Sequence, residues 1–289
     1  MIRIILLAVA LAACSPGASE SEGPIVGVLE DRPGANDQEP ARFVVRAVFH
    51  KVGGEWRAYD ASAGVRAFPR AQDWTIADRG EALGQVRAQT PASWSLGADV
   101  GRMEITGGEA PTRGERSDTF AGWVGTPVYR PLVAVSPANV ADPQQWTALR
   151  ASGSAIASAR AVFRTHFTEV RNCANESSAA TPFTYSDEQI EAGDGYFSTD
   201  GWSIVTLRLT GYHCDGPIYD TAFNNQVFAV SRSGETTYLG EGLIYVDAGD
   251  YDGDGKSDVI FAIDRYNLGG YALFTNDFAQ HADFTFSYH

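Results

Sequence analysis

The chain has 289 residues, a net charge of −14, and contents of 44% hydrophobic and 11% aromatic residues. Nucleic acids and anionic lipid surfaces repel a protein this acidic, so a nucleic-acid-binding function is excluded. The hydrophobic content is that of a chain with a packed core, and it argues against a disordered protein. Composition therefore predicts a folded protein without naming its activity.

The first residues have the composition of an export signal. Arg3 supplies a basic residue, residues 4–11 are apolar, and the two small residues Ala12 and Ala13 follow. The apolar run is much shorter than the roughly 20 residues that cross a bilayer. It therefore predicts a cleaved signal peptide over residues 1–13.

The end of this segment, Leu11-Ala12-Ala13-Cys14, resembles the lipobox of bacterial lipoproteins. The resemblance implies that Cys14 is acylated and becomes the new N-terminus, so that the protein is held on a membrane of the cell envelope by its lipid. Ser15 in the next position implies the outer membrane. Acyl chains contribute roughly 0.8 kcal/mol per buried methylene, which anchors a chain without a transmembrane helix. The alternative is an ordinary cleaved signal that ends in the same residues.

The segment after Cys14 is predicted to be a flexible tether. Residues 14–40 are rich in Ser, Gly, Pro and acidic residues, which bury too little surface to become ordered. Residues 25–29 are an apolar interruption, and the alternative for them is a strand that docks on the folded part. The rest is predicted to form an N-terminal β-rich domain over 41–137 and a C-terminal α+β domain over 138–289, or one unit made of both.

The remaining cysteines support an exported protein. Cys173 and Cys214 are an even pair in an oxidising compartment, which predicts a disulfide between them. The alternative is two free buried thiols.

Most of the chain has the pattern of β-strands. Residues 43–51 and 56–59 are predicted to form one hairpin, and residues 74–77 and 83–86 a second, each across a turn that contains glycine. The predicted strands are 43–51, 56–59, 74–77, 83–86, 205–209, 226–231, 236–239 and 284–288.

Helical patterns lie in the middle of the chain. Asp142-Pro143 is the pattern of a helix start. The spacing of apolar residues over 156–170 predicts an amphipathic helix. Ser186 and Gln189 have the spacing of a capping box. His166 lies on the apolar face of that helix and is interpreted as a core histidine and not as a metal ligand. Because strands precede and follow this helical segment, the predicted fold class is β-rich α+β, with antiparallel sheets and hairpins.

Residues 250–258 carry the clearest chemistry. Their sequence, DYDGDGKSD, places carboxylates at relative positions one, three, five and nine, with Gly255 at position six. Calcium takes about six to eight oxygen ligands, and alternate side chains converge around an ion when a glycine makes the sharp turn. The alternative is a solvated acidic turn. The predicted calcium ligands are the side chains of Asp250, Asp252, Asp254 and Asp258 and the backbone carbonyl of Lys256.

The loop is not an EF-hand, because its twelfth position is Phe261 and not a bidentate glutamate. A calcium loop that leads directly into an apolar strand, here 259–263, resembles the FG-GAP and VCBS repeats of integrin-like and bacterial surface proteins. The resemblance covers residues 246–274 in a single copy. It implies a structural calcium ion and does not extend to a whole propeller.

No catalytic motif accompanies the calcium loop. The sequence has neither a Gly-x-Ser-x-Gly elbow nor His-Glu-x-x-His, and its histidines are scattered. We therefore expect a non-enzymatic envelope lipoprotein that binds a protein or a glycan. The alternative is a calcium-stabilised hydrolase acting on envelope polysaccharide, which would need two carboxylates about 5 to 9.5 Å apart in a pocket. The six tryptophans are interpreted either as core residues or as the lining of a glycan groove.

Overall fold

The structure is a computed structural model. It describes residues 23–32, 42–94, 97–111, 130–137, 139–172, 179, 181–211, 225–265 and 267–287. Residues 1–13, Cys14, Cys173 and Cys214 lie outside these ranges. The signal peptide, the lipid anchor and the disulfide therefore stay predictions.

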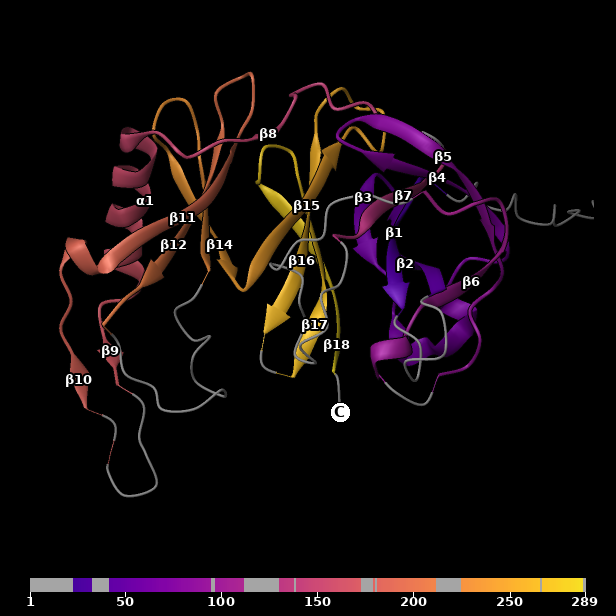
Figure 1. Ribbon diagram of the computed structural model, residues 1–289, viewed down its shortest axis with the longest axis horizontal. Helices are drawn as coiled ribbons and strands as arrows, with labels where there is room; N and C mark the ends of the chain where they lie inside the picture. The colour runs from indigo at the N-terminus through magenta and orange to yellow at the C-terminus, as the bar shows by residue number, and fades with distance from the viewer. Residues whose placement is uncertain are drawn as a thin grey trace, which may run out of the picture.

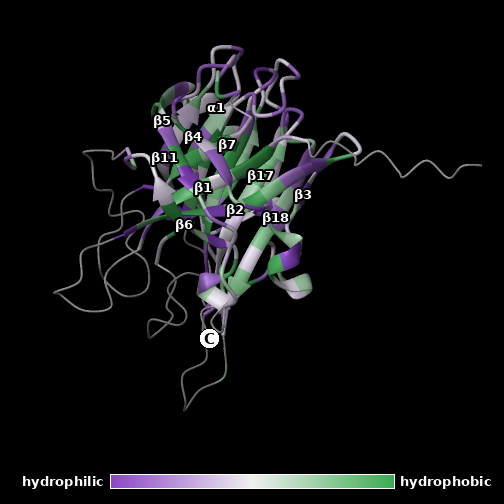
Figure 2. Cartoon of the chain, turned by 90° about the vertical axis from the view of Figure 1, so that its right-hand side faces the viewer, coloured by the Kyte–Doolittle hydropathy of each residue, from purple (hydrophilic) through white to green (hydrophobic). Residues whose placement is uncertain are grey.

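The described residues form a β-rich α+β fold with antiparallel sheets, which confirms the predicted class. Figure 1 shows three layers side by side, with a four-stranded sheet between a seven-stranded sheet and a five-stranded sheet that carries the helix. Hydrophobic residues gather along the strands, and hydrophilic residues prevail in the loops at the upper end of the view (Figure 2). None of the described helices has the length and apolar character needed to span a membrane.

The N-terminal layer is a closed barrel. β1 pairs with both β7 and β2, so that six strands form a ring in the order β1, β7, β4, β5, β6, β2, while β3 extends from β2. Two 3₁₀ helices lie in its connections. The elements are β1 (Ile25–Arg32), β2 (Arg42–Val52), β3 (Glu55–Ala58), η1 (Ala61–Ala67), β4 (Gln72–Asp78), β5 (Glu81–Ala88), η2 (Gly97–Asp99), β6 (Arg102–Gly107) and β7 (Leu132–Ser136).

Strand β1 corrects the predicted tether over residues 14–40. Ile25–Arg32 is a strand of the barrel with hydrogen-bonded neighbours on both edges. Val26 and Val28 are fully buried. The short apolar run is enough to form a strand, because β2 and β7 provide hydrogen-bond partners for its backbone and the barrel core buries its side chains. This part of the predicted tether is thus the strand that closes the barrel.

The middle layer is buried on both faces. Its strands follow one another as hairpins. Ile260 and Leu273 belong to the hydrophobic core shared with the barrel, whereas Phe261 and Phe274 belong to the core on the opposite side. Burial on both faces explains the uninterrupted apolar run over 259–263. The strands are β15 (Leu243–Gly249), β16 (Asp258–Arg265), β17 (Leu268–Thr275) and β18 (Gln280–Ser287).

The third layer is a sheet of five strands in the order β14, β13, β12, β11, β8, covered by helix α1. Ala159 and Phe163 of the helix are fully buried against it. The elements are β8 (Thr147–Ala148), α1 (Gly153–His166), η4 (Asp187–Gln189), β11 (Ile190–Phe197), β12 (Ser203–Leu209), β13 (Gln226–Val230) and β14 (Thr236–Glu241), with a separate pair β9 (Val170–Arg171) and β10 (Pro182–Phe183).

The helical predictions are partly right. The capping box is present, since the amide of Ser186 donates to the side chain of Gln189 at 2.9 Å. Helix α1 ends at His166, which is exposed and is not a core histidine. Asp142 does not begin a helix. Its carboxylate accepts from the amides of Gln144 at 3.1 Å and Trp146 at 2.6 Å, and so it caps a turn that leads into β8.

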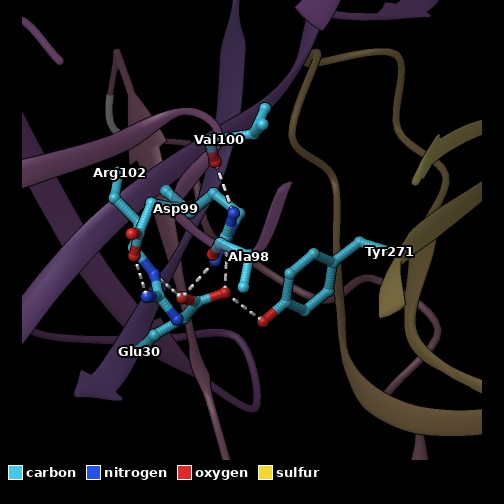
Figure 3. Close-up of polar contacts among 7 residues, drawn as sticks. Glu30, Ala98, Asp99, Val100, Arg102 and Tyr271 are labelled. Atoms are coloured by element: carbon cyan, nitrogen blue, oxygen red, sulfur yellow. Dashed lines mark hydrogen bonds and ion pairs between the residues drawn. The ribbon is translucent and has the colours of Figure 1, made fainter. Parts of the chain in front are cut away.

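A buried ion cluster joins the barrel to the middle sheet (Figure 3). Glu30 of β1 accepts from Arg46 of β2 at 2.6 and 2.9 Å and from Arg102 of β6 at 3.1 Å. The hydroxyl of Tyr271, on β17, donates to the same carboxylate at 2.8 Å. Arg46 is fully buried and also donates to the carbonyl of Ala98 at 2.7 Å. Three barrel strands and one middle strand therefore meet at one carboxylate.

The cluster keeps Glu30 ionised. Burial alone would raise its pKa, but the charges of Arg46 and Arg102, with the hydrogen bonds from Arg46 and Tyr271, outweigh burial and lower the pKa from 4.5 to about 2. A carboxylate with a lowered pKa in the folded state stabilises the protein above pH 4.5, and this contribution is lost as the pH falls through about 2.

We predict that Glu30→Gln lowers the free energy of unfolding at neutral pH by about 3 to 5 kcal/mol, because it leaves the buried Arg46 without a carboxylate, while Arg102 keeps only Asp99. The deficit relative to the native protein should shrink as the pH falls from about 4.5 to 2, where Glu30 is itself protonated. Denaturant unfolding across this pH range measures both effects.

The matched control is Glu191→Gln, which removes a carboxylate from an exposed pair with Arg208. Its effect should stay below about 1 kcal/mol at every pH. An equal loss for the two variants would contradict the role assigned to the buried cluster.

Candidate calcium site

The acidic loop connects β15 to β16. Gly253 and Gly255 have φ values of +79° and +87°, which glycine adopts without strain. These turns bring three side chains together: carboxylate oxygens of Asp250, Asp252 and Asp254 all lie within 4.8 Å of one another. The spacing in the sequence therefore produces the convergence that it predicts for these three aspartates.

One oxygen of each of the three carboxylates holds the loop in shape. Asp250 Oδ2 accepts from the amide of Gly255 at 3.0 Å, and Asp252 Oδ1 accepts from the amide of Asp254 at 3.1 Å. Asp254 Oδ1 accepts from the amide of Lys256 at 2.8 Å. The loop is thus folded around its own carboxylates, and the second oxygen of each is left for other partners.

Within residues 250–258, two buried carboxylate oxygens accept no hydrogen bond from any residue that the structure describes. They are Asp250 Oδ1 and Asp258 Oδ2. Asp258 is only 3% exposed, and burial together with the carboxylates of Asp252 and Asp254 raises its pKa to about 8. A buried polar oxygen without a partner is costly, and a cation among these groups would remove that cost. The donor set, oxygen atoms of carboxylates, fits a hard divalent ion such as calcium.

The other predicted ligands are placed differently. Asp258 is the first residue of β16 and is not one of the three carboxylates within 4.8 Å of one another. Lys256 directs its ammonium group to Asn276 at 3.1 Å and to Asp277 at 2.5 Å, in the turn between β17 and β18. Participation of Asp258 and of the Lys256 carbonyl in metal binding stays a prediction.

Two residues of the barrel also contact the loop, and neither was predicted from the sequence. The ammonium group of Lys51, on β2, contacts Asp252 Oδ2, and Trp56 Nε1, on β3, donates to the same oxygen at 3.1 Å. Lys51 is 201 positions away from Asp252 in the chain. One signal was available: the chain has only two lysines, Lys51 and Lys256, and both contact this part of the structure.

A second set of contacts fixes the loop from the other side. The amide of Asp250 donates to the carbonyl of Ala141 at 2.7 Å. The hydroxyl of Ser257, a buried residue, donates to Asp142 at 2.5 Å and accepts from the amide of Gln144 at 3.2 Å. The segment between β7 and β8 therefore holds both ends of the loop.

Two nearby aspartates are not part of the cluster. Both oxygens of Asp247 accept from the amide of Arg79, in the hairpin turn between β4 and β5, at 3.0 Å each. Asp264 is exposed at the far end of β16. Neither supplies an oxygen to the group of three carboxylates.

No family model matches the chain, and neither a curated protein nor a solved structure matches it. The resemblance of the loop to FG-GAP and VCBS repeats therefore stays a prediction from the sequence.

We predict that Lys51→Met, measured in chelator, lowers the free energy of unfolding by about 1 to 3 kcal/mol, because it removes a charged donor from the largely buried carboxylate of Asp252. Denaturant unfolding gives this value. The control is Arg57→Met on β3, whose partner Glu55 is exposed, and it should change stability by less than about 1 kcal/mol. Equal effects of the two variants would show that Lys51 is not a partner of the loop.

Proposed function

We propose that this protein is a lipid-anchored protein of the bacterial envelope whose β-rich body is a non-enzymatic binding module, stiffened by one structural calcium ion. The observation that carries the calcium part is the pair of buried oxygens, Asp250 Oδ1 and Asp258 Oδ2, that no described donor reaches. Calcium when bound would supply the positive charge that this group of carboxylates lacks.

The position of the loop favours a structural role for the ion. The loop contacts the barrel through Lys51, the segment before β8 through Ser257, and the turn between β17 and β18 through Lys256. An ion held by Asp250, Asp252 and Asp254 would fix the point where these parts meet. Metal binding to such a loop contributes folding free energy, because the unfolded chain holds no preformed site.

The hydrolase alternative gains no support from the cavity beside the start of β1, the β2–β3 hairpin and η1. That cavity has a volume of about 620 Å³, and no carboxylate lines it. Polysaccharide hydrolysis would require two carboxylates there. Trp74 and Trp146, two candidates for a glycan groove, are buried in the core. A protein or glycan of the envelope is therefore proposed as a bound partner and not as a substrate.

We predict that calcium raises the melting temperature of the native protein. With a Kd of ~10⁻⁴ to 10⁻³ M, usual for extracellular modules, about 10 mM calcium stabilises the fold by about 1.4 to 2.7 kcal/mol. For a chain of this size the shift is about 3 to 10 °C. Asp254→Asn should abolish the shift, because it removes the charge of one of the three carboxylates that would hold the ion. Asp254 is exposed and bonds within the loop, so the rest of the fold should be unaffected.

The matched control for this experiment is Asp283→Asn on β18, which removes an exposed carboxylate away from the loop. It should keep the full response to calcium. A native protein that melts at the same temperature in calcium and in chelator would refute the structural calcium ion.

The lipid anchor has its own test. A fatty-acid probe added to cells that produce the full chain should label the protein and leave it in the membrane fraction. Cys14→Ala should abolish the label, because acylation requires the thiol. Cys173→Ser, which leaves the lipobox intact, should be labelled normally. Labelling of Cys14→Ala would contradict the proposed anchor.

A further inference from the structure

A cavity of about 620 Å³ lies where the start of β1, the β2–β3 hairpin and η1 meet. It has the size of small-molecule binding sites, which range over about 300 to 1,000 Å³. The thirteen lining residues are Gly23, Pro24, Ile25, His50, Lys51, Val52, Gly53, Gly54, Tyr59, Arg66, Ala67, Phe68 and Pro69.

The cavity is basic although the protein is strongly acidic. Three of its lining residues, His50, Lys51 and Arg66, are bases, and none is an aspartate or glutamate. The whole chain carries a net charge of −14. Arg66 is exposed, and its guanidinium makes no ion pair or hydrogen bond within the part of the chain that the structure describes. A guanidinium pairs well with a carboxylate, which it binds with two parallel hydrogen bonds.

One wall of the cavity is a fixed column of rings. His50 stacks on Tyr59 with ring centroids 4.4 Å apart, and Tyr59 stacks on Phe68 at 5.1 Å. Trp94 meets Phe68 edge-on at 5.4 Å. Tyr59 and Phe68 are 7% and 5% exposed, so packing holds both rings in place. The edges of these rings, with the half-buried His50, give this side of the cavity an apolar and aromatic surface.

The hairpin side of the cavity is open. Gly53 and Gly54 form the turn between β2 and β3 with φ values of +60° and +87°, and a Cβ at either position would meet no heavy atom within 4 Å. A ligand therefore reaches the column and the bases without displacing a side chain at this turn.

We propose that this cavity binds a small carboxylate carried on a six-membered ring, either aromatic or a sugar acid. Arg66 pairs with the carboxylate at the mouth, and the ring lies against the wall formed by His50, Tyr59 and Phe68. Lys51 supplies the second positive charge.

Lys51 also connects the cavity to the acidic loop, and this part of the inference rests on the proposed calcium site. Its ammonium group contacts Asp252, so in the absence of metal much of its charge is neutralised there. Calcium on Asp252 would share that carboxylate and leave more of the Lys51 charge for the ligand. Calcium therefore strengthens binding of the carboxylate.

Isothermal titration of the purified chain with benzoate, and separately with glucuronate, tests the proposal in calcium and in chelator. We expect at least one of the two to bind. The probe that binds more tightly shows whether the cavity prefers an aromatic acid or a sugar acid. Arg66→Gln should weaken that binding about tenfold in chelator. Arg70→Gln, an exposed arginine that does not line the cavity, should leave the affinity within about twofold. Circular dichroism checks that both variants fold.

Absence of binding of both probes to the native protein, or equal affinity of the native protein and Arg66→Gln, would overturn the proposal. Calcium binding is titrated on the same samples. If calcium binds but neither probe does, the cavity proposal fails and the calcium site stands. If a probe binds but calcium does not, the calcium site fails and the cavity proposal stands. Equal probe affinity in the two buffers, with calcium bound, would overturn the part assigned to Lys51.

Discussion

The structure depends on how the charge of the acidic loop is neutralised. Four carboxylates lie within nine residues, and like charges about 4 Å apart repel by about 1 kcal/mol in water and several times more when partly buried. Backbone amides of the loop donate hydrogen bonds to one oxygen each of Asp250, Asp252 and Asp254. Lys51 and Trp56 contact the other oxygen of Asp252. These donors leave Asp250 Oδ1 and Asp258 Oδ2 unpaired among the described residues. We propose that a divalent cation satisfies both.

Two polar connections hold the barrel against the middle sheet, and they work in different ways. The cluster around Glu30 contains its own counter-charges, Arg46 and Arg102, and is complete within the chain. The acidic loop has a surplus of negative charge, so a bound cation would strengthen the connection that it makes. The first connection should weaken in acid, and the proposed calcium ion would make the second depend on calcium. Export, as proposed above, would place the loop where calcium is concentrated enough to fill weak sites.

Local patterns in the sequence predicted what local geometry decides. The hairpins β2–β3 and β4–β5, the strands β12, β13 and β14, and the convergence of Asp250, Asp252 and Asp254 all depend on nearby residues. Contacts between distant segments decide the rest. The sequence near residues 25–32 does not indicate that this strand pairs with β7 and β2. The sequence near Lys51 does not indicate its contact with Asp252, which is 201 positions away. Asp142 carries the pattern of a helix cap, but it caps a turn because Ser257 and the buried Trp146 fix that segment in place.

The most direct measurement is the metal content of the purified, folded protein after equilibrium dialysis in millimolar calcium. The proposed calcium site predicts about one bound calcium ion per chain when the site is saturated, and a loss of that ion in a double variant of Asp250→Asn and Asp258→Asn, which neutralises the two carboxylates with unpaired buried oxygens. A native protein that retains no calcium, or a double variant that retains as much as the native protein, would contradict it.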